Sequence, residues 1–482
     1  MKRIKLGLLS LGFFSSFLIF AQNDQDAVRY GIYKPKGTSR SQSLSGAINA
    51  MGADFSNASN NVAGLGVFRK SQTSITLDLT YSAVRTGYFN ESTLGKKATP
   101  GIGNAGFLYS HRLGDEKKTK GLLFLNIYAG YNKINDFNRI VHFKGMNDAS
   151  SFLEPWMNNV NQGIAGTFYE QLALETELLY QPVSNGPFVA FDAPWPQIRK
   201  YQTKFIQGRG SLGEINLAAS GNISNKLYFG VGLNINTLNY NEVAEFTETE
   251  ADQKVADFLS YTFREELRTK GTGYNVKLGF IYRPADFIRI GLAFHTPTWF
   301  TLTDRFSNEL RVVYDNGNRP KAVSPDGFYR YKYTMPLEVQ GSVAFVFGRK
   351  AFIDLEYEYN PSKSMKFREF NGTHMDLNQL IRDNFKSVHT LRLGAEYKLG
   401  MLGLRAGGFF GSSLLSPGLN NMPIWGLSGG LGLRLPSGFF LDASYQFIQN
   451  KYVYRPYVGP NSSPSTSRQQ WHTPSLTLGV AF

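Results

Sequence analysis

The chain has 482 residues, no cysteine and a formal net charge of +14. The absence of cysteine excludes disulfide bonds, zinc–thiolate sites and cysteine nucleophiles. After the N-terminus no stretch is apolar over the roughly 18 residues that a transmembrane helix needs, which excludes helical membrane proteins. Aromatic residues make up 14% of the chain, and aromatic residues without apolar runs are typical of strands in which every second side chain is apolar.

Residues 1–21 have the parts of a secretory signal peptide. A positive start is followed by an apolar run over residues 4–20 and by the small residue Ala21. An anchoring helix is the alternative, but the run is short for a full span and the chain turns polar directly after it. We predict an exported protein and leave these residues out of the fold.

The charge of the mature chain is +11, since Lys2, Arg3 and Lys5 leave with the signal peptide. The remaining positive charges are scattered and form no basic run. In an exported protein, such charge favours contact with anionic lipid head groups over nucleic-acid binding. We therefore expect membrane lipids, and no nucleic acid, among its partners.

Residues 37–69 are rich in small and polar residues and too irregular for a membrane strand. Leu44, Ile48 and Met51 share one face of a weak helical pattern. We predict that the surrounding segment, residues 22–71, is a plug, or hatch, that closes a barrel formed by the rest of the chain.

Alternating strands begin at Gln72 and continue to the end of the chain. Ile75, Leu77 and Leu79 alternate with polar residues. Apolar side chains outward and polar side chains inward are the pattern of a membrane barrel. We predict an all-β fold, a transmembrane antiparallel β-barrel over residues 72–482.

The predicted strands come in pairs joined by tight turns, and long polar segments separate the pairs. This alternation places the turns on the periplasmic side and the long segments outside. About fourteen strands result, an even number, as single-chain bacterial barrels have. We expect them from residue 72 on and at residues 101–112, 121–131, 212–223, 226–239, 271–283, 287–298, 333–347, 351–359, 388–398, 402–410, 425–435, 439–448 and 471–482.

The longest connection, at about residues 132–209, contains two amphipathic patterns, at residues 150–162 and 168–180. An insertion with two helices suits an external loop of a barrel. Residues 241–270 contain many Asp and Glu residues, and we interpret them as a second, solvated external loop.

The last strand carries the strongest local signal. Leu476, Leu478 and Val480 alternate up to the terminal residue, Phe482. An aromatic C-terminus on an alternating strand resembles the assembly signal of bacterial outer-membrane barrels. We expect a location in the outer membrane and recognition of Phe482 by the barrel-assembly machinery.

The motifs of enzymes are weak in this chain. Ser428 lies in a G-x-S-x-G match, but the match falls within a predicted strand that no helix follows, whereas a nucleophile elbow needs a strand, a sharp turn and a helix. No histidine pair has a metal-binding spacing such as H-E-x-x-H. His295 and His472 lie near predicted strand ends, where histidine commonly serves as an interface residue, and haem binding by one of them is the alternative. We predict no enzyme, no metal site and no cofactor.

Three carboxylates, Asp354, Glu356 and Glu358, share one face of a predicted strand. Acid–base catalysis is one interpretation. A row facing the lumen, paired with inward bases such as Arg392 on the following strand, is the better one, because buried charges need partners. We expect a polar lumen that is packed shut.

Several stretches are similar to the FadL-type long-chain fatty-acid transporters of the bacterial outer membrane. SQSLSGAINAMGADFSNASNNVAGL resembles the hatch of that family, in which Asn61 and Ala63 match an Asn-Pro-Ala signature and Val62 stands where proline is usual. GYNKINDFNR and GTGYNVKLGFIYRPADFIRIGLAFHTPTWF are also similar, and the second contains an N-x-K-x-G-x-x-Y-x-P core. The resemblance covers essentially the whole mature chain.

The resemblance implies a fourteen-stranded barrel with a hatch, a hydrophobic ligand bound first among external loops, and sideways release near a kinked third strand. Asn61, Val62 and Ala63 would then lie against the wall near the exit. Apolar residues of the long insertion are candidates for the ligand path, although packing of the loop on itself explains them equally well. These candidates are Phe152, Trp156, Phe168, Leu172, Phe188, Phe191 and Trp195.

A long-chain fatty acid is the expected ligand, and its carboxylate needs a base or hydroxyl nearby. Arg199, Lys200 and Lys204 are the candidates. Aromatic hydrocarbons, haem and other lipids also fit an apolar path, and we expect contact with outer-membrane lipids and lipopolysaccharide. Two alternatives are a secretion-associated interaction barrel with an open lumen or a protein-sized groove, and a lipid hydrolase with a Ser or Thr beside a His.

Overall fold

A computed structural model describes most of the chain after the predicted signal peptide. Residues 1–21 lie outside the described part, so their assignment stays a prediction. No described helix is long and apolar enough to cross a membrane. The described residues are 29–31, 36–164, 168–193, 198–252, 254–255, 257–371, 373, 375–416, 422–457 and 462–482.

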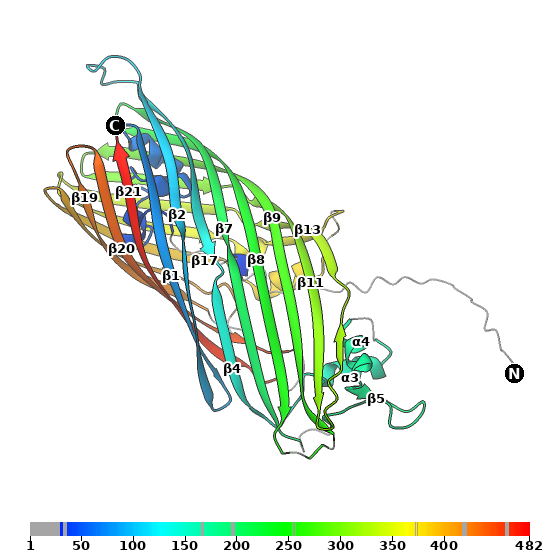
Figure 1. Ribbon diagram of the computed structural model, residues 1–482. Coiled ribbons are helices and arrows are strands. Elements are labelled where there is room, and N and C mark those ends of the chain that lie inside the picture. Colours follow the sequence, from blue (N-terminus) through cyan, green and yellow to red (C-terminus); the bar gives the residue numbers. More distant parts are fainter. Residues whose placement is uncertain are drawn as a thin grey trace.

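The strands form one closed antiparallel barrel of fourteen strands (Figure 1), as predicted. The first strand pairs with the second on one side and with the last on the other, which closes the wall. Four barrel strands are interrupted, and the pieces of each strand together occupy one position in the wall. In chain order the strands are β1 (Gln72–Tyr88), β2 (Glu91–Arg112), β3 with β4 (Leu122–Asp136, Arg139–Asn147), β7 (Lys200–Ile223), β8 (Leu227–Glu250), β9 (Phe258–Ala285), β10 with β11 (Ile288–His295, Thr298–Tyr314), β12 with β13 and β14 (Lys321–Val323, Gly327–Met335, Glu338–Phe347), β15 with β16 (Ala351–Asn360, Lys366–Glu369), β17 (Val388–Leu399), β18 (Leu402–Gly411), β19 (Ile424–Arg434), β20 (Phe439–Tyr454) and β21 (Ser465–Ala481).

Alternation along β1 shows why these residues form a membrane wall. Ile75, Leu77 and Leu79 are exposed on the outer surface, whereas Thr76 and Asp78 are buried inside. Other strands repeat this pattern near the tight turns, so that an apolar band surrounds that end of the barrel. The inward polar groups are shielded from lipid, and the backbone groups pair between strands.

The strands extend much further outward than predicted. Residues 241–270, expected to be a loop, belong mostly to β8 and β9, which pair from Leu227 with Tyr282 to Thr249 with Ser260. Aromatic residues such as Phe246 and Phe263 are buried on the inward face of this hairpin, together with Glu248. The charges resemble a solvated loop in composition, but the cross-strand pairs hold the segment as sheet.

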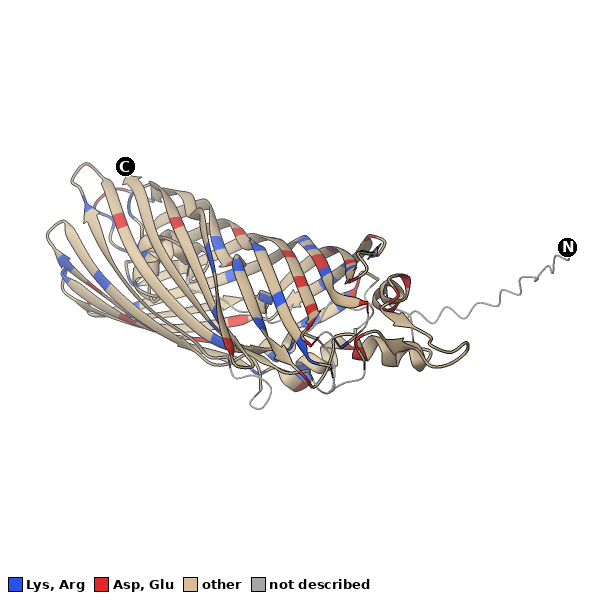
Figure 2. Cartoon of the chain, turned by 60° about the horizontal axis from the view of Figure 1, so that its bottom comes forward, with Lys and Arg blue, Asp and Glu red and all other residues tan. Residues whose placement is uncertain are grey.

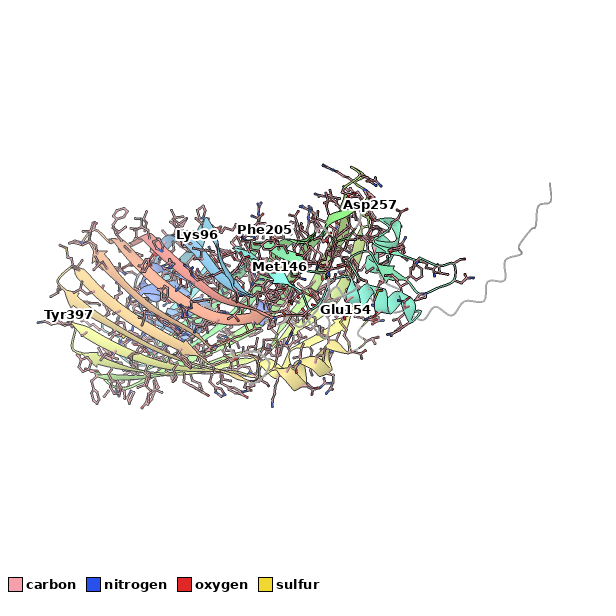
Figure 3. The ribbon with its side chains drawn as sticks, turned by 90° about the horizontal axis from the view of Figure 1, so that it is seen from below. Lys96, Met146, Glu154, Phe205, Asp257 and Tyr397 are labelled. Carbon is pink, nitrogen blue, oxygen red and sulfur yellow. The ribbon has the colours of Figure 1, made fainter. Side chains whose placement is uncertain are left out.

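The helical insertion is correspondingly shorter than the expected range of residues 132–209, because β3, β4 and β7 occupy both of its ends. Its helices lie at the outer end of the barrel (Figure 1). Figure 3 shows Glu154 and Asp257 at this outer end and Tyr397 at the opposite end. The insertion consists of α3 (Glu154–Asn161), α4 (Phe168–Glu175) and a hairpin of β5 (Leu179–Tyr180) with β6 (Val189–Ala190). Two further elements follow β15, namely the turn η3 (Ser362–Ser364) and the helix α5 (Leu377–Asn384).

Residues 36–71, which we call the inner segment, lie inside the barrel (blue in Figure 1). They form α2 (Ser39–Ser43) and two 3-10 turns, η1 (Phe55–Ala58) and η2 (Val62–Val67). Leu44 and Ile48 are fully buried in one apolar cluster with Phe352, and Met51 packs against it. The three residues therefore share one apolar cluster against the wall, but the predicted helical pattern is wrong, because α2 ends at Ser43 and residues 44–46 form a turn.

The inner segment approaches the wall closely at Gly279 in β9. A Cβ atom at Gly279 would lie 2.2 Å from Asn61 Oδ1 and 2.6 Å from the backbone nitrogen of Ala63. We predict that Gly279→Ala destabilises the protein by about 1–3 kcal/mol, because backbone atoms of the inner segment must move. The midpoint of thermal unfolding, followed by the heat-dependent mobility shift of folded barrels on gels, should fall.

The matched control is Gly341→Ala in β14, where no atom lies within 4 Å of the added Cβ. Equal midpoints for the two variants would contradict close packing of the inner segment on β9.

Candidate functional site

A row of carboxylates lines the lumen on β15, as the sequence predicted. Arg392 on the neighbouring strand β17 forms ion pairs of 2.6 Å with both Glu356 and Glu358. Asp354 accepts a hydrogen bond of 3.1 Å from the backbone N–H of Met51 in the inner segment. The row therefore pairs with a wall base, as expected, and also binds the inner segment.

A second charged group joins the inner segment to the wall. Arg40 of α2 donates to Glu396 over 3.0 Å, and Arg405 of β18 donates to the same carboxylate over 2.7 Å and to Asp442 over 2.6 Å. All four side chains are buried or nearly so. Buried charges in such a chain are each compensated, which holds the segment in one position.

Asn61, Val62 and Ala63 are fully buried against the wall. The Asn61 side chain donates to the carbonyls of Phe280 in β9 and of Asn49, both over 3.2 Å, and accepts from Ala63 N–H. Val62 is the first residue of η2, and the preceding residue is extended, with φ −107° and ψ 97°. Such a backbone also suits a proline at this position.

His295 lies beside this contact, inside the barrel. Its Nε2 atom is 2.6 Å from the Asn60 carbonyl, and its Nδ1 atom is 3.4 Å from Glu338. The expected place at the membrane interface is wrong for His295, because β10 turns this side chain inward. His472, in contrast, lies with its Nδ1 atom 2.6 Å from the hydroxyl of Tyr445, an exposed residue on the outer surface.

The wall is interrupted between β2 and β4. The ladder of β2 with β3 joins residues 104–112 to residues 124–132, and β3 ends at Asp136. The strand breaks between Asp136 and Arg139, and β4 then pairs with β7. Within the described residues no ladder joins β4 to β2. Side chains cross the interruption instead: the Thr93 hydroxyl donates to the His142 carbonyl, and Lys97 Nζ donates to the Gly208 carbonyl over 2.9 Å.

The contact of Asn61, Val62 and Ala63 is not at this interruption. They touch β8 and β9, while β3 and β7 lie between those strands and the interruption. The position of these residues near an exit stays a prediction, and they do not lie at the interruption beside β4. The small residues of β8 and β9 explain the location, since they let the backbone of η2 approach.

An apolar cluster, which we call the inner cluster, fills the lumen next to the inner segment. Tyr30 is fully buried there, with ring centroids 6.0 Å from those of both Phe137 and Tyr333. Its buried members are Tyr30, Phe137, Leu212, Leu238, Tyr240, Phe300, Leu302, Tyr331, Tyr333, Met335, Met365, Phe367, Met375, Leu377, Ile381, Phe385, Leu414, Leu415 and Met422.

The inner cluster was missed from the sequence because its residues are spread over five strands, the helix α5 and several connecting segments. Inward-facing apolar residues on the outer parts of β8 and β11 were the available signal, since they reverse the polar-inward parity of the lower barrel. A cavity of about 40 Å³ lies where Leu414 and Met422 meet the Glu358–Arg392 pair. Four methionines give this cluster an adaptable lining.

A second apolar cluster, the outer cluster, lies under the external helices. Phe152, Trp156 and Leu172 are buried in it against Phe246 of β8 and Phe263 of β9. These candidates therefore pack on the barrel wall and not only on one another. Phe191 is half-buried beside them, Phe168 and Phe188 are half-buried outside the cluster, and Trp195 lies outside the described residues.

The three predicted carboxylate contacts already have carboxylate partners in the protein. Arg199 pairs with Asp252 over 2.5 Å, Lys200 with Asp192 over 3.5 Å, and Lys204 with Glu265 over 3.2 Å. Lys200 and Lys204 are almost fully buried. The structure thus brings Lys200 and Lys204 inside the outer mouth, and leaves Arg199 exposed.

Several solved structures have a similar architecture. The toluene transporter TodX of Pseudomonas putida is 12% identical, with a TM-score of 0.56 over 94% of this chain and 99% of that one. A FadL homologue of Pseudomonas aeruginosa is 10% identical, with a TM-score of 0.55 over 93% and 99%. The monoaromatic hydrocarbon channel CymD is 13% identical, with a TM-score of 0.51 over 93% and 97%.

The chain has the FadL-type outer-membrane barrel fold. TodX is described as a transporter, CymD as a channel and the Pseudomonas aeruginosa protein as a FadL homologue, and none of the three as an enzyme. No family model matches the sequence, and no curated protein matches it either. Identities of this size establish the fold alone, so the ligand has to be argued from the site.

In this FadL-type barrel the G-x-S-x-G match is part of the wall. Ser428 lies within β19, and its hydroxyl donates to the carbonyl of Ser43 over 3.0 Å and lies 2.7 Å from the Ser45 hydroxyl. The motif holds α2 and shows none of the strand–turn–helix geometry of a nucleophile elbow.

A buried polar network joins the insertion to the outer extension of the FadL-type barrel, beyond the apolar band. Ser151 Oγ lies 2.6 Å from Asp192 Oδ2 and 2.7 Å from Glu248 Oε2. A hydroxyl has a single proton to donate, so both contacts are hydrogen bonds only when one carboxyl group is protonated. Tyr261 donates to Glu248 over 2.5 Å, and Lys200 faces Asp192.

Burial and, to a smaller extent, the Asp192 carboxylate raise the pKa of Glu248 to about 7, while Lys200 opposes the rise. A carboxyl group with a raised folded-state pKa stabilises the fold below its unfolded pKa, and this contribution is lost as pH rises through the folded-state value. We predict that the insertion docks more firmly at pH 5 than at pH 8, by at most about 3 kcal/mol.

Hydrogen exchange of α3 and α4, measured across pH 5 to 8 and corrected for intrinsic rates, should show protection falling near pH 7. Glu248→Gln should keep the protection and flatten its pH dependence. A wild-type protection that does not change with pH would exclude the shared proton.

Proposed function

We propose that this protein is an outer-membrane transporter that carries hydrophobic ligands through a plugged barrel, and no enzyme. The observation that carries the proposal is a series of inward apolar groups in the outer half of the barrel, with paired or buried polar residues such as Glu242 and Asp304 between them. On β8, Leu238 and Tyr240 belong to the inner cluster and Phe246 to the outer cluster. On β11, Leu302 and Leu310 join the same two clusters.

A third apolar group lies between these clusters beside the interrupted wall. It contains Val141 and Phe143 of β4, Ile206 of β7 and Ala244 of β8. An apolar ligand taken up under the external helices would meet apolar side chains at each level down to the inner cluster. The neighbours described as carriers of toluene and monoaromatic hydrocarbons support a ligand of this class.

The inner segment is proposed to act as the hatch, within the predicted range of residues 22–71. Its bonds to β9, β14, β15, β17 and β21 support a plug that stays in place. Lateral release into the bilayer is proposed at the interruption between β2 and β4, because a ligand can pass between strands only where the ladder is absent.

Long-chain fatty acids are the proposed ligands. Lys97 supports them, because this cation lies at the interruption and its ammonium bonds a carbonyl, with no ion pair among the described residues. A carboxylate leaving with an apolar tail would find a charged partner there. The predicted contacts at Arg199, Lys200 and Lys204 would have to exchange their protein partners first.

Deleting residues 22–69 tests the hatch. The deleted barrel should fold and conduct small polar ions in planar bilayers, because the plug is gone and the wall ladders are intact, whereas the full-length barrel should stay closed. Unchanged conductance would exclude a plugging role for the segment.

Lateral release is tested by bridging the interruption. The chain lacks cysteine, so Thr93→Cys with His142→Cys gives one thiol pair, across β2 and β4. Bridging the pair with a short bis-thiol reagent should abolish transfer of a fluorescent fatty acid into proteoliposome bilayers. The two single-cysteine variants treated in the same way are the controls. Full transfer through the bridged barrel would exclude this exit.

A further inference from the structure

Four arginines, of which Arg69 belongs to the inner segment, lie at the tight-turn end of the barrel. Arg69 and Arg112 approach the same ring, with their guanidinium carbons 4.6 and 5.4 Å from the centroid of Phe124. Arg112 and Arg283 lie close enough to Arg69 for their positive charges to repel it. Arg69 and Arg283 repel Arg289 in the same way. Basic residues mark several turns at this end, which carries the C-terminus (Figure 2).

The partners of these arginines are mostly neutral. Arg69 donates to the carbonyls of Gly66 and Phe68, both over 3.2 Å, and to the Asn225 amide oxygen over 2.7 Å. Arg112 donates to carbonyls of the turn that follows β2. None of these acceptors carries a charge, so both cations remain uncompensated by them.

Arg289 and Arg283 differ only slightly from this pattern. Arg289 donates to the Met51 carbonyl over 2.6 Å, with Asp354 as a more distant carboxylate. Arg283 pairs with Asp286 over 2.7 Å, and that carboxylate is 97% exposed. By contrast, Arg392 and Arg405 deeper in the lumen each bond two buried carboxylates.

Two nitrogen donors in this group have no hydrogen-bond acceptor in the part of the chain that the structure describes. The Nε atoms of Arg283 and Arg289 are buried and bond no acceptor among the described residues. Buried donors and like charges both cost free energy unless an acceptor with negative charge is bound. Guanidinium groups match the planar or tetrahedral oxygens of carboxylates and phosphates.

We propose that Arg69, Arg283 and Arg289, with Arg112 beside them, form a binding site for one carboxylate or phosphate group at the tight-turn mouth. Phe124 and Tyr228 give the site an apolar side, since Arg69 lies 4.6 and 5.9 Å from their ring centroids. An anionic amphiphile fits this combination. The source of the group is a soluble anion or an anionic phospholipid, and the site is independent of the hydrophobic-ligand path.

The test uses the full-length barrel in a neutral detergent. Isothermal titration with inorganic phosphate and with octanoate measures the soluble anions. Native mass spectrometry from nanodiscs of phosphatidylcholine with phosphatidylglycerol counts bound anionic lipid. The variants are Arg283→Gln with Arg289→Gln, and the control is Arg349→Gln, a cation in the turn between β14 and β15.

The double variant should bind the anion at least tenfold more weakly, and the control should bind it with unchanged affinity. Binding of phosphate or octanoate alone supports a soluble source, and binding of phosphatidylglycerol alone supports a lipid source. No binding, or equal weakening in the control, would overturn the proposal. Should the double variant fail to fold, Arg283→Lys and Arg289→Lys keep the charge and should weaken binding several-fold through loss of the paired donors.

Discussion

A barrel of fourteen strands encloses more space than its inward side chains fill. The inner segment occupies that space, and its irregular backbone brings polar groups that must find partners away from water. The wall supplies them: Asp354 accepts from Met51, and Thr477 accepts from Ser39. The inner segment in turn supplies Arg40 to Glu396. In the closed barrel, the polar wall and the inner segment therefore provide hydrogen-bond and ion-pair partners for each other.

This mutual dependence explains why the lumen changes character along the barrel axis. The half near the tight turns is polar because it binds the inner segment. Further out, where the inner segment no longer reaches, the inward faces of β8 and β11 carry more apolar residues, which pack around Tyr30 and the external helices. One set of strands thus presents two different interiors, and the ligand path is proposed only in the apolar half.

The sequence predicted the features that repeat with a period of two. The strand count, the outward Leu77 and Leu79, and the pairing of Glu356 with Arg392 all follow from alternation. Features that depend on distant contacts were missed. The hairpin of β8 and β9 looked like a loop, because pairing across strands, and not composition, holds it as sheet. The carboxylate partners of Lys200 and Lys204 are likewise invisible in one sequence.

The length of β9 has a consequence for where a ligand is first met. Its 28 residues at about 3.3 Å each span roughly 90 Å. A tilt of about 40° reduces this to a height of roughly 70 Å, against an apolar band of about 25 Å. The barrel therefore extends several nanometres beyond the hydrocarbon on its outer side. The outer cluster lies near its rim, so under the proposed function a water-insoluble molecule would be captured outside the polar layer and would pass that layer inside the barrel.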